Sequence, residues 1–262
     1  MEDIAYKAIF FDIDGTLLSH ETNSVPDSAA AAISALQAQG VKVFAATGRH
    51  ILELRALPLE KVDFDGFITL NGSLCLDRDE RVIFSKTYDP NDAALLAEAF
   101  AAHTLPMIIT EKDRFYVNYA DDNVRRTMRE IDTEVPEIGT YGGAPFYQAS
   151  IFVPNPQEYP FISRLAHTGL VKWNPTGFDF TIEGLGKSDG ILAILEHFGL
   201  PLAQSIVFGD GENDLDMLQM GAFSVAMGNA PKHIQAAASM TCGHIDRDGV
   251  AGALRELFRL DI

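Results

Sequence analysis

Two aspartates separated by one residue follow a short apolar run near the start of the chain. The run is AIFF at residues 8–11, and DIDGT follows it at residues 12–16. Because positions i and i+2 of an extended chain face the same way, the carboxylates of Asp12 and Asp14 can reach one site. One carboxylate can attack phosphorus while its second oxygen holds a metal ion, and the other can protonate a leaving group and later deprotonate water. A solvated acidic turn is the alternative interpretation of a lone Asp-x-Asp.

Two further segments carry groups that suit a phosphoryl oxygen. Thr47-Gly48-Arg49 follows the apolar run VKVFAA, and it offers a hydroxyl and an unhindered backbone N–H. Lys187 follows Gly184 and Gly186 at a predicted helix start, where its charge opposes the helix dipole. A cation at a helix N-terminus is mildly destabilising, and an ammonium that points into an anion site would explain why it is kept there. The alternative interpretation of Thr47-Gly48 is that Thr-Gly ends the strand for purely conformational reasons. The alternative for Lys187 is an ordinary surface lysine.

The fourth segment is GDGEND at residues 209–214, after the apolar run SIVF. Its glycines let the backbone approach a ligand, and Asp210 can complete an oxygen-rich magnesium site with Asp12. Asn213 and Asp214 open the next predicted helix, so N-capping is the structural alternative for either residue.

The elements that must position these segments alternate between strand and helix. Apolar runs without polar alternation at 8–11, 41–46, 67–70, 205–208 and 223–227 predict buried parallel strands. Helices are predicted at 27–39, 51–57, 187–198 and 214–220. This order predicts an α/β fold with a doubly wound, mostly parallel sheet, and three of the four segments follow predicted strands at the carboxyl edge where ligands bind.

The middle of the chain follows a different pattern. Strands are predicted at 107–110, 115–118, 150–153 and 178–182, with helices at about 91–103 and 122–131. We interpret this stretch as an α+β module inserted into the α/β core. The predicted organisation is core at 1–82, inserted module at 83–184, and core again at 185–262.

The composition excludes several classes of partner. The net charge is −17, from 37 acidic and 20 basic residues, and such a field repels nucleic acid. No apolar run reaches the length of a membrane span, and the start of the chain does not look like a signal peptide. Cys75 and Cys242 match no zinc or redox spacing, so we expect reduced thiols in a cytoplasmic protein.

Together the four segments resemble the haloacid dehalogenase superfamily of aspartyl-phosphate hydrolases. FFDIDGTLL at 10–18 and GDGENDLDML at 209–218 are specific matches, and the Thr47 and Lys187 motifs occur in the expected order. The long insert, TLNGS at 69–73 and DRDGV at 246–250 are similar to the Cof-type branch, which carries a C2B-type α+β cap.

The resemblance implies a role for each motif residue. Asp12 would be nucleophile and Mg²⁺ ligand, and Asp14 would be general acid/base and offer its backbone carbonyl to the metal. Asp210 would be the third metal ligand, with Asp214 supporting the metal shell. Phosphate would be bound by Thr47, Gly48, Lys187 and Asn213, with the backbone N–H groups of Ile13 and Asp14.

The resemblance also implies a cap that closes over a small phosphorylated substrate. A sugar phosphate is expected first, with pyridoxal phosphate or flavin mononucleotide as alternatives. A phosphosugar mutase and a non-catalytic phosphometabolite-binding module are the alternative functions. Candidate pocket residues in the cap are Tyr116, Tyr119, Trp173, Asn174 and Phe178, although most aromatics of such a module form its own core. Four residues that flank the core motifs could also line the pocket: His20, Arg49, Asn71 and His50. For His50, an exposed helix-start histidine is the favoured interpretation.

Overall fold

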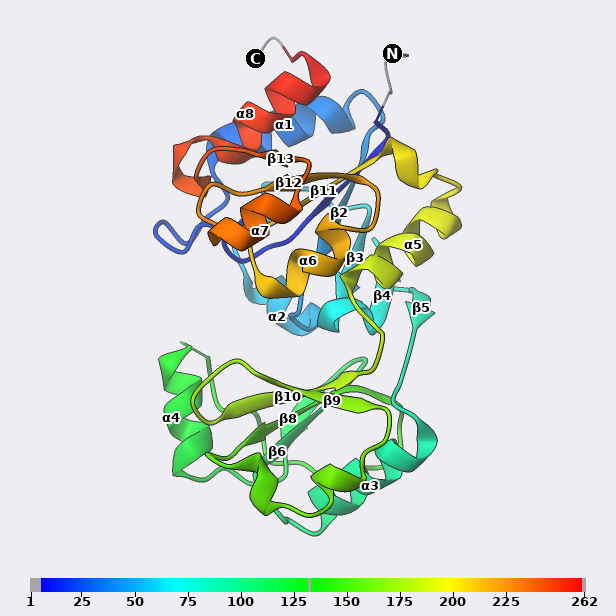
Figure 1. Cartoon of the computed structure of the whole chain (residues 1–262), viewed down its shortest axis with the longest axis vertical. Helices are drawn as coiled ribbons and strands as arrows, with labels where there is room; N and C mark the ends of the chain where they lie inside the picture. Colours follow the sequence, from blue (N-terminus) through cyan, green and yellow to red (C-terminus); the bar gives the residue numbers. More distant parts are fainter. Residues whose placement is uncertain (1–5, 132, 261–262) are drawn as a thin grey trace. The chain divides into compact units, whose positions relative to one another are not determined.

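The apolar runs of the sequence form the centre of an eight-stranded sheet (Figure 1). The computed structural model describes residues 6–131 and 133–260. Six neighbouring strands run parallel to one another. The other two strands extend one edge of the sheet by antiparallel pairing. In spatial order the strands are β13 (Met240–Thr241), β12 (Phe223–Ala226), β11 (Ser205–Gly209), β1 (Ala8–Phe11), β2 (Lys42–Ala46), β3 (Gly66–Thr69), β4 (Leu74–Asp77) and β5 (Val82–Ser85).

Helices cover both faces of this sheet. Helices α5 (Lys187–Phe198), α6 (Leu215–Leu218) and α7 (Lys232–Ala237) share one apolar core with Phe10 and Phe44, whose rings stack with centroids 4.8 Å apart. Helices α1 (Asp27–Gln37) and α8 (Gly249–Phe258) pack against each other on the other side (Figure 1). The short α2 (Ile51–Ala56) follows β2. Burial of both faces explains why the central strands read as continuous apolar runs.

The inserted module is an antiparallel sheet with two helices. Its strand order is β7 (Phe115–Val117), β6 (Met107–Glu111), β8 (Phe146–Phe152), β10 (Gly177–Ile182) and β9 (Thr168–Lys172). Helix α3 (Pro90–Ala101) contributes to one apolar cluster, and α4 (Asp122–Glu130) to a second on β6 and β8. The prediction of a doubly wound α/β core with an inserted α+β cap is confirmed.

Contacts divide the chain into two units, one of residues Met1–Ser85 with Gly186–Ile262 and one of Lys86–Leu185. The helix predicted at 187–198 has those bounds, whereas α1 ends two residues before the predicted Gln39, and β8 begins four residues before Ser150. Strand β9 was not predicted, because its residues are mostly exposed and lack the apolar pattern of the others. Across 6–131 and 133–260, no helix is both long and apolar enough to cross a bilayer.

Candidate active site

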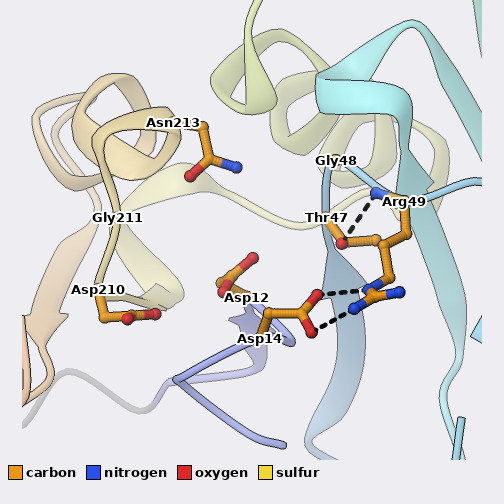
Figure 2. Close-up of a pocket in the computed structure, with 8 residues that line it drawn as sticks. All are labelled: Asp12, Asp14, Thr47, Gly48, Arg49, Asp210, Gly211 and Asn213. Carbon is orange, nitrogen blue, oxygen red and sulfur yellow. Dashed lines mark hydrogen bonds and ion pairs between the residues drawn. The ribbon is translucent and has the colours of Figure 1, made fainter. Parts of the chain in front are cut away.

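A cavity of about 190 Å³ opens at the carboxyl edge of the core sheet (Figure 2). It lies where β1, β2 and β11 end, and backbone bonds carry the strand pairing past these ends. Asp12 N donates to Phe208 O at 2.9 Å, and Thr47 N donates to Ile68 O at 2.8 Å. The lining combines residues from three of the four chemical segments: Asp12, Asp14, Thr47, Gly48, Arg49, Asp210, Gly211 and Asn213.

Lys187 and Asp214 lie beside Asp12 and are fully buried. The Lys187 Nζ atom lies 2.6 Å from Asp12 Oδ1 and 2.6 Å from Asp214 Oδ1. Burial acts to lower the pKa of Lys187, but the two carboxylates outweigh it and raise the pKa, so the ammonium stays charged. Burial raises the pKa of Asp12 well above its ordinary value, with Lys187 opposing and Asp214 adding to the rise.

Two carboxylates place Lys187 by capping the start of α5. Ser188 N donates to Asp216 Oδ2 at 2.7 Å, and Gly186 N donates to Asp189 Oδ2 at 2.9 Å. Anionic caps offset the unfavourable placement of a lysine at a helix N-terminus. A Cβ at Gly186 would lie 2.1 Å from Asp216 Oδ2, so glycine permits this close approach.

Arg49 holds Asp14 through a two-bond ion pair. Arg49 Nε lies 2.6 Å from Asp14 Oδ2 and Nη2 lies 2.8 Å from Oδ1, so the Asp14 carboxylate points toward Arg49 (Figure 2). The hydrogen bond that Arg49 donates to Asp14 is the main cause that raises the pKa of Arg49. A bidentate guanidinium–carboxylate pair fixes the plane of the acid as well as its position.

Two residues that the sequence interpretation missed hold Asp210. Thr16 Oγ1 donates to Asp210 Oδ1 at 2.8 Å, and Asn229 Nδ2 lies 3.3 Å from Asp210 Oδ2. Asn229 Nδ2 also donates to Gly15 O at 2.7 Å, which joins the first motif to the fourth. Asn229 follows β12, so the rule that ligands gather beyond the carboxyl ends of parallel strands could have identified it.

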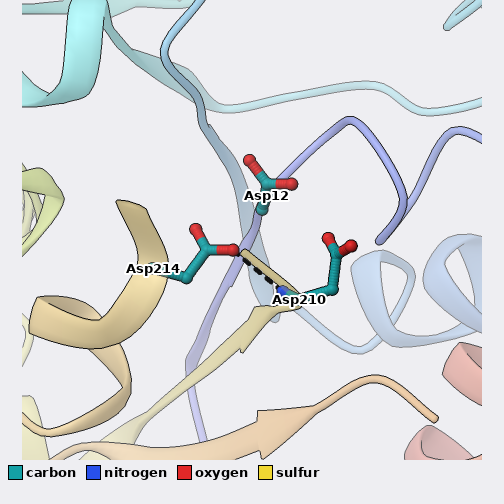
Figure 3. Close-up of side chains that lie close together, drawn as sticks. All are labelled: Asp12, Asp210 and Asp214. Carbon is teal, nitrogen blue, oxygen red and sulfur yellow. Dashed lines mark hydrogen bonds between the residues drawn. The ribbon is translucent and has the colours of Figure 1, made fainter. Parts of the chain in front are cut away.

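The acidic cluster fits a hard divalent cation (Figure 3). Asp12, Asp210 and Asp214 each place a carboxylate oxygen within 4.8 Å of the others. Asp214 uses Oδ1 for Lys187 and Oδ2 for the N–H groups of Asp210 and Gly211, both at 2.8 Å. Asp214 therefore organises the cluster, while Asp12 and Asp210 have the oxygen donors that suit Mg²⁺. Three carboxylates around one ammonium leave an excess of negative charge that a cation would balance.

The candidate pocket residues beside the core motifs and in the cap differ in burial and in their hydrogen-bond partners. His50 is 1% exposed and its Nδ1 accepts from Leu52 N, so the expectation of an exposed side chain is wrong, although it does cap α2. Tyr116 and Phe178 are buried in the cap core. Trp173 Nε1 donates to Asp179, and Asn174 donates to Glu130. His20 is exposed and Tyr119 is partly buried.

Comparison with known proteins agrees with this geometry. YkrA of Bacillus subtilis is 30% identical over 96% of this chain and 97% of its own length. The sugar phosphatase BT4131, of haloacid dehalogenase subclass IIB, is 32% identical, with a TM-score of 0.80 over 97% of this chain and all of its own. BT1666 of Bacteroides thetaiotaomicron, a phosphatase of the same superfamily, is 25% identical, with a TM-score of 0.86 over 99% of this chain and 97% of its own. The sequence model of the haloacid dehalogenase-like hydrolase family matches residues 9–254, and the chain belongs to this family.

Proposed function

We propose that the protein is a magnesium-dependent phosphatase that hydrolyses small phosphorylated metabolites, sugar phosphates first, through a phosphoryl group carried on Asp12. One observation carries the proposal. The carboxylate of Asp12 lines the cavity, is bonded to the buried ammonium of Lys187, and lies beside Asp210. Similarity to phosphatases of the family supports the same activity.

Asp12, Asp210 and the backbone carbonyl of Asp14 would hold Mg²⁺, with Asp214 orienting them. When bound, the ion would neutralise charge on the phosphoryl oxygens and on the cluster. The ion would also affect the protonation of Asp12, because burial and the nearby carboxylates raise the pKa of this side chain. A cation and Lys187 together favour the ionised form that attack requires.

The chain's own groups account for both steps of the reaction. In the first step, an oxygen of Asp12 forms a bond to phosphorus, the ester P–O bond breaks, and Asp14 gives a proton to the leaving oxygen. In the second step, Asp14 takes a proton from water, the water oxygen bonds to phosphorus, and the bond to Asp12 breaks. Asp14 must exchange Arg49 for the leaving oxygen to perform this role, since it is paired with Arg49 here. Thr47, Gly48, Lys187, Asn213 and the N–H groups of Ile13 and Asp14 would bind the phosphoryl oxygens.

The names of two similar proteins suggest a substrate class. BT4131 is a sugar phosphatase, and YbjI of Escherichia coli, 23% identical over 98% of this chain and 97% of its own length, is a 5-amino-6-(5-phospho-D-ribitylamino)uracil phosphatase. Both names describe phosphate esters of polyhydroxylated carbon chains. We propose the same class here, and a cytoplasmic setting is supported by the free thiols of Cys75 and Cys242.

The test is phosphate release from a panel of sugar phosphates, nucleotides and cofactor phosphates, with and without Mg²⁺. We expect release that requires Mg²⁺ and falls by at least about 10³-fold in Asp12→Asn, because no other group replaces the nucleophile. Circular dichroism checks that the variant is folded. Near-normal release by Asp12→Asn would contradict the nucleophile assignment, and an isomerised sugar phosphate in place of free phosphate would identify a mutase.

A further inference from the structure

Three consecutive residues after β3 have a left-handed backbone. The φ angles are 51° at Leu70, 51° at Asn71 and 97° at Gly72. Left-handed backbone is unfavourable for a leucine, and a run of such residues persists only where the surroundings enforce it. We therefore expect contacts around the turn to hold it in this conformation.

The turn is bonded to the segment that ends β2. Asn71 N donates to Thr47 O at 3.0 Å, and Leu70 N donates to Arg49 O at 3.2 Å. The side chain of Asn71 covers Gly48, where a Cβ would lie 3.1 Å from both Asn71 Oδ1 and Nδ2. These contacts restrict the position of Gly48.

The same turn contacts the two other segments assigned to phosphate. Asn213 Nδ2 donates to Asn71 Oδ1 at 3.2 Å. A Cβ at Gly72 would lie 2.1 Å from Gly186 O, so the turn also approaches the residue before Lys187. Segments separated by more than a hundred residues in the chain meet at this one turn.

We infer that Asn71 is a positioning residue that holds Asn213 and Gly48 in the geometry for binding phosphate. The inference deepens the proposed function and rests on its phosphate site. Asn71 is absent from the residues that line the cavity, so it acts through its neighbours. Asparagine meets both demands of the position, since it tolerates left-handed backbone and carries an amide that reaches Asn213.

The test measures the affinity for inorganic phosphate by calorimetry in Mg²⁺ buffer, beside the kcat and KM of ester hydrolysis. Asn71→Gly tolerates the left-handed backbone and removes the side chain that carries the amide. We expect Kd for phosphate and KM to rise together by about 3- to 10-fold, as for a lost hydrogen bond, with kcat within about twofold. Asn23→Gly is the matched control, since Asn23 is exposed and also has positive φ, 46°; it should change neither constant.

A double-mutant cycle separates action through Asn213 from direct contact. We expect Asn71→Gly to cost less in Asn213→Ala than in the wild-type protein. An equal cost in both backgrounds overturns the inferred action through Asn213. So does a lower kcat with unchanged KM and Kd, which is the result of a role in folding alone. A wild-type protein that binds phosphate but hydrolyses no ester contradicts only the proposed function, and one that binds no phosphate overturns both.

Discussion

Lys187, Asp12 and Asp214 form a buried ion triad in the core unit. Lys187 is 0% exposed, and its ammonium is shared between Asp12 and Asp214. Removing one partner from such a group leaves an uncompensated buried charge, which costs about 3–5 kcal/mol. The function proposed here requires a charged lysine beside the Asp12 carboxylate, and the capped start of α5 offsets part of the cost of burying it.

Asp14 gives a prediction about the leaving group. In the proposed mechanism Asp14 protonates the leaving oxygen, so we expect Asp14→Asn to lower the turnover of alkyl phosphates by about 10²–10⁴-fold. The loss should be much smaller for p-nitrophenyl phosphate, whose leaving group departs without protonation. Steady-state rates on both esters measure this, with Asp113→Asn as the control, because Asp113 is exposed in the cap. Equal losses on both esters would count against the assigned role.

The candidate residues that follow strands could be predicted from the sequence, whereas the residues that position them could not. Asp12, Thr47 and Asp210 were predicted to converge because each follows a buried apolar run, and they line one cavity. Thr16 and Asn229 bond to Asp210 across 194 and 19 residues, and spacing alone does not disclose such contacts. The pairing of Arg49 with Asp14 depends on side-chain direction, which also lies outside a strand-and-helix pattern.

At the scale of elements, helices and strands with a buried apolar face could be predicted from the sequence, whereas an exposed strand could not. Helix α5 has an apolar face and a closing glycine, Gly199, in left-handed backbone, and its bounds were predicted. Among the residues that the structure describes, strand β9 pairs with β10 alone, at the edge of its sheet. It is largely exposed, so its sequence lacks an apolar pattern. An edge strand of this kind is defined by its neighbour's hydrogen bonds, which a local pattern does not contain.

Asp92 joins two elements of the cap. Its carboxylate, 1% exposed in the first turn of α3, accepts from Ala166 N at 3.0 Å, His167 N at 2.8 Å and Thr168 Oγ1 at 2.7 Å. Burial acts to raise the pKa of Asp92, but these hydrogen bonds outweigh it and hold the pKa below its ordinary value of 3.8. Asp92 thus stabilises the folded cap above the ordinary pKa, and this stabilisation is lost as pH falls through the lowered pKa.

We therefore expect Asp92→Ala to lower the free energy of unfolding of the cap by about 1–3 kcal/mol at neutral pH, because buried donors lose their acceptor. The difference from wild type should shrink once the pH falls below the ordinary carboxyl range. Urea unfolding followed by the fluorescence of Trp173, the single tryptophan, reports on the cap unit. A difference that stays constant across the acid range would contradict the charged role of Asp92.

At the scale of the molecule, an acidic protein is proposed to bind an acidic substrate. The net charge is −17, so a phosphate ester meets repulsion everywhere except where local cations reverse the sign. Lys187 and a bound cation would provide that reversal at the cavity. Metal binding should therefore be linked to the stability of the core unit, which contains the acidic cluster.

We expect Mg²⁺ at about 100 times its Kd to stabilise the core unit by about 2.7 kcal/mol, because only the folded state presents the cluster. Unfolding followed by far-ultraviolet circular dichroism should show the shift, while the Trp173 transition keeps its midpoint, since the cap has its own apolar core. Asp210→Asn should remove most of the shift. Equal stabilisation of the Asp210→Asn variant would place the ion elsewhere.

The strand order also has a consequence for synthesis on the ribosome. Strand β1 pairs with β11, as Ala8 with Ser205, so one edge of β1 stays unpaired until roughly 200 more residues have emerged. The cap unit is contiguous, Lys86–Leu185, and all its strands emerge before β11. We expect the cap to fold first on the nascent chain, with the core completed only when β11 is released. The module inserted within the core sequence would thus reach its native state before the core does.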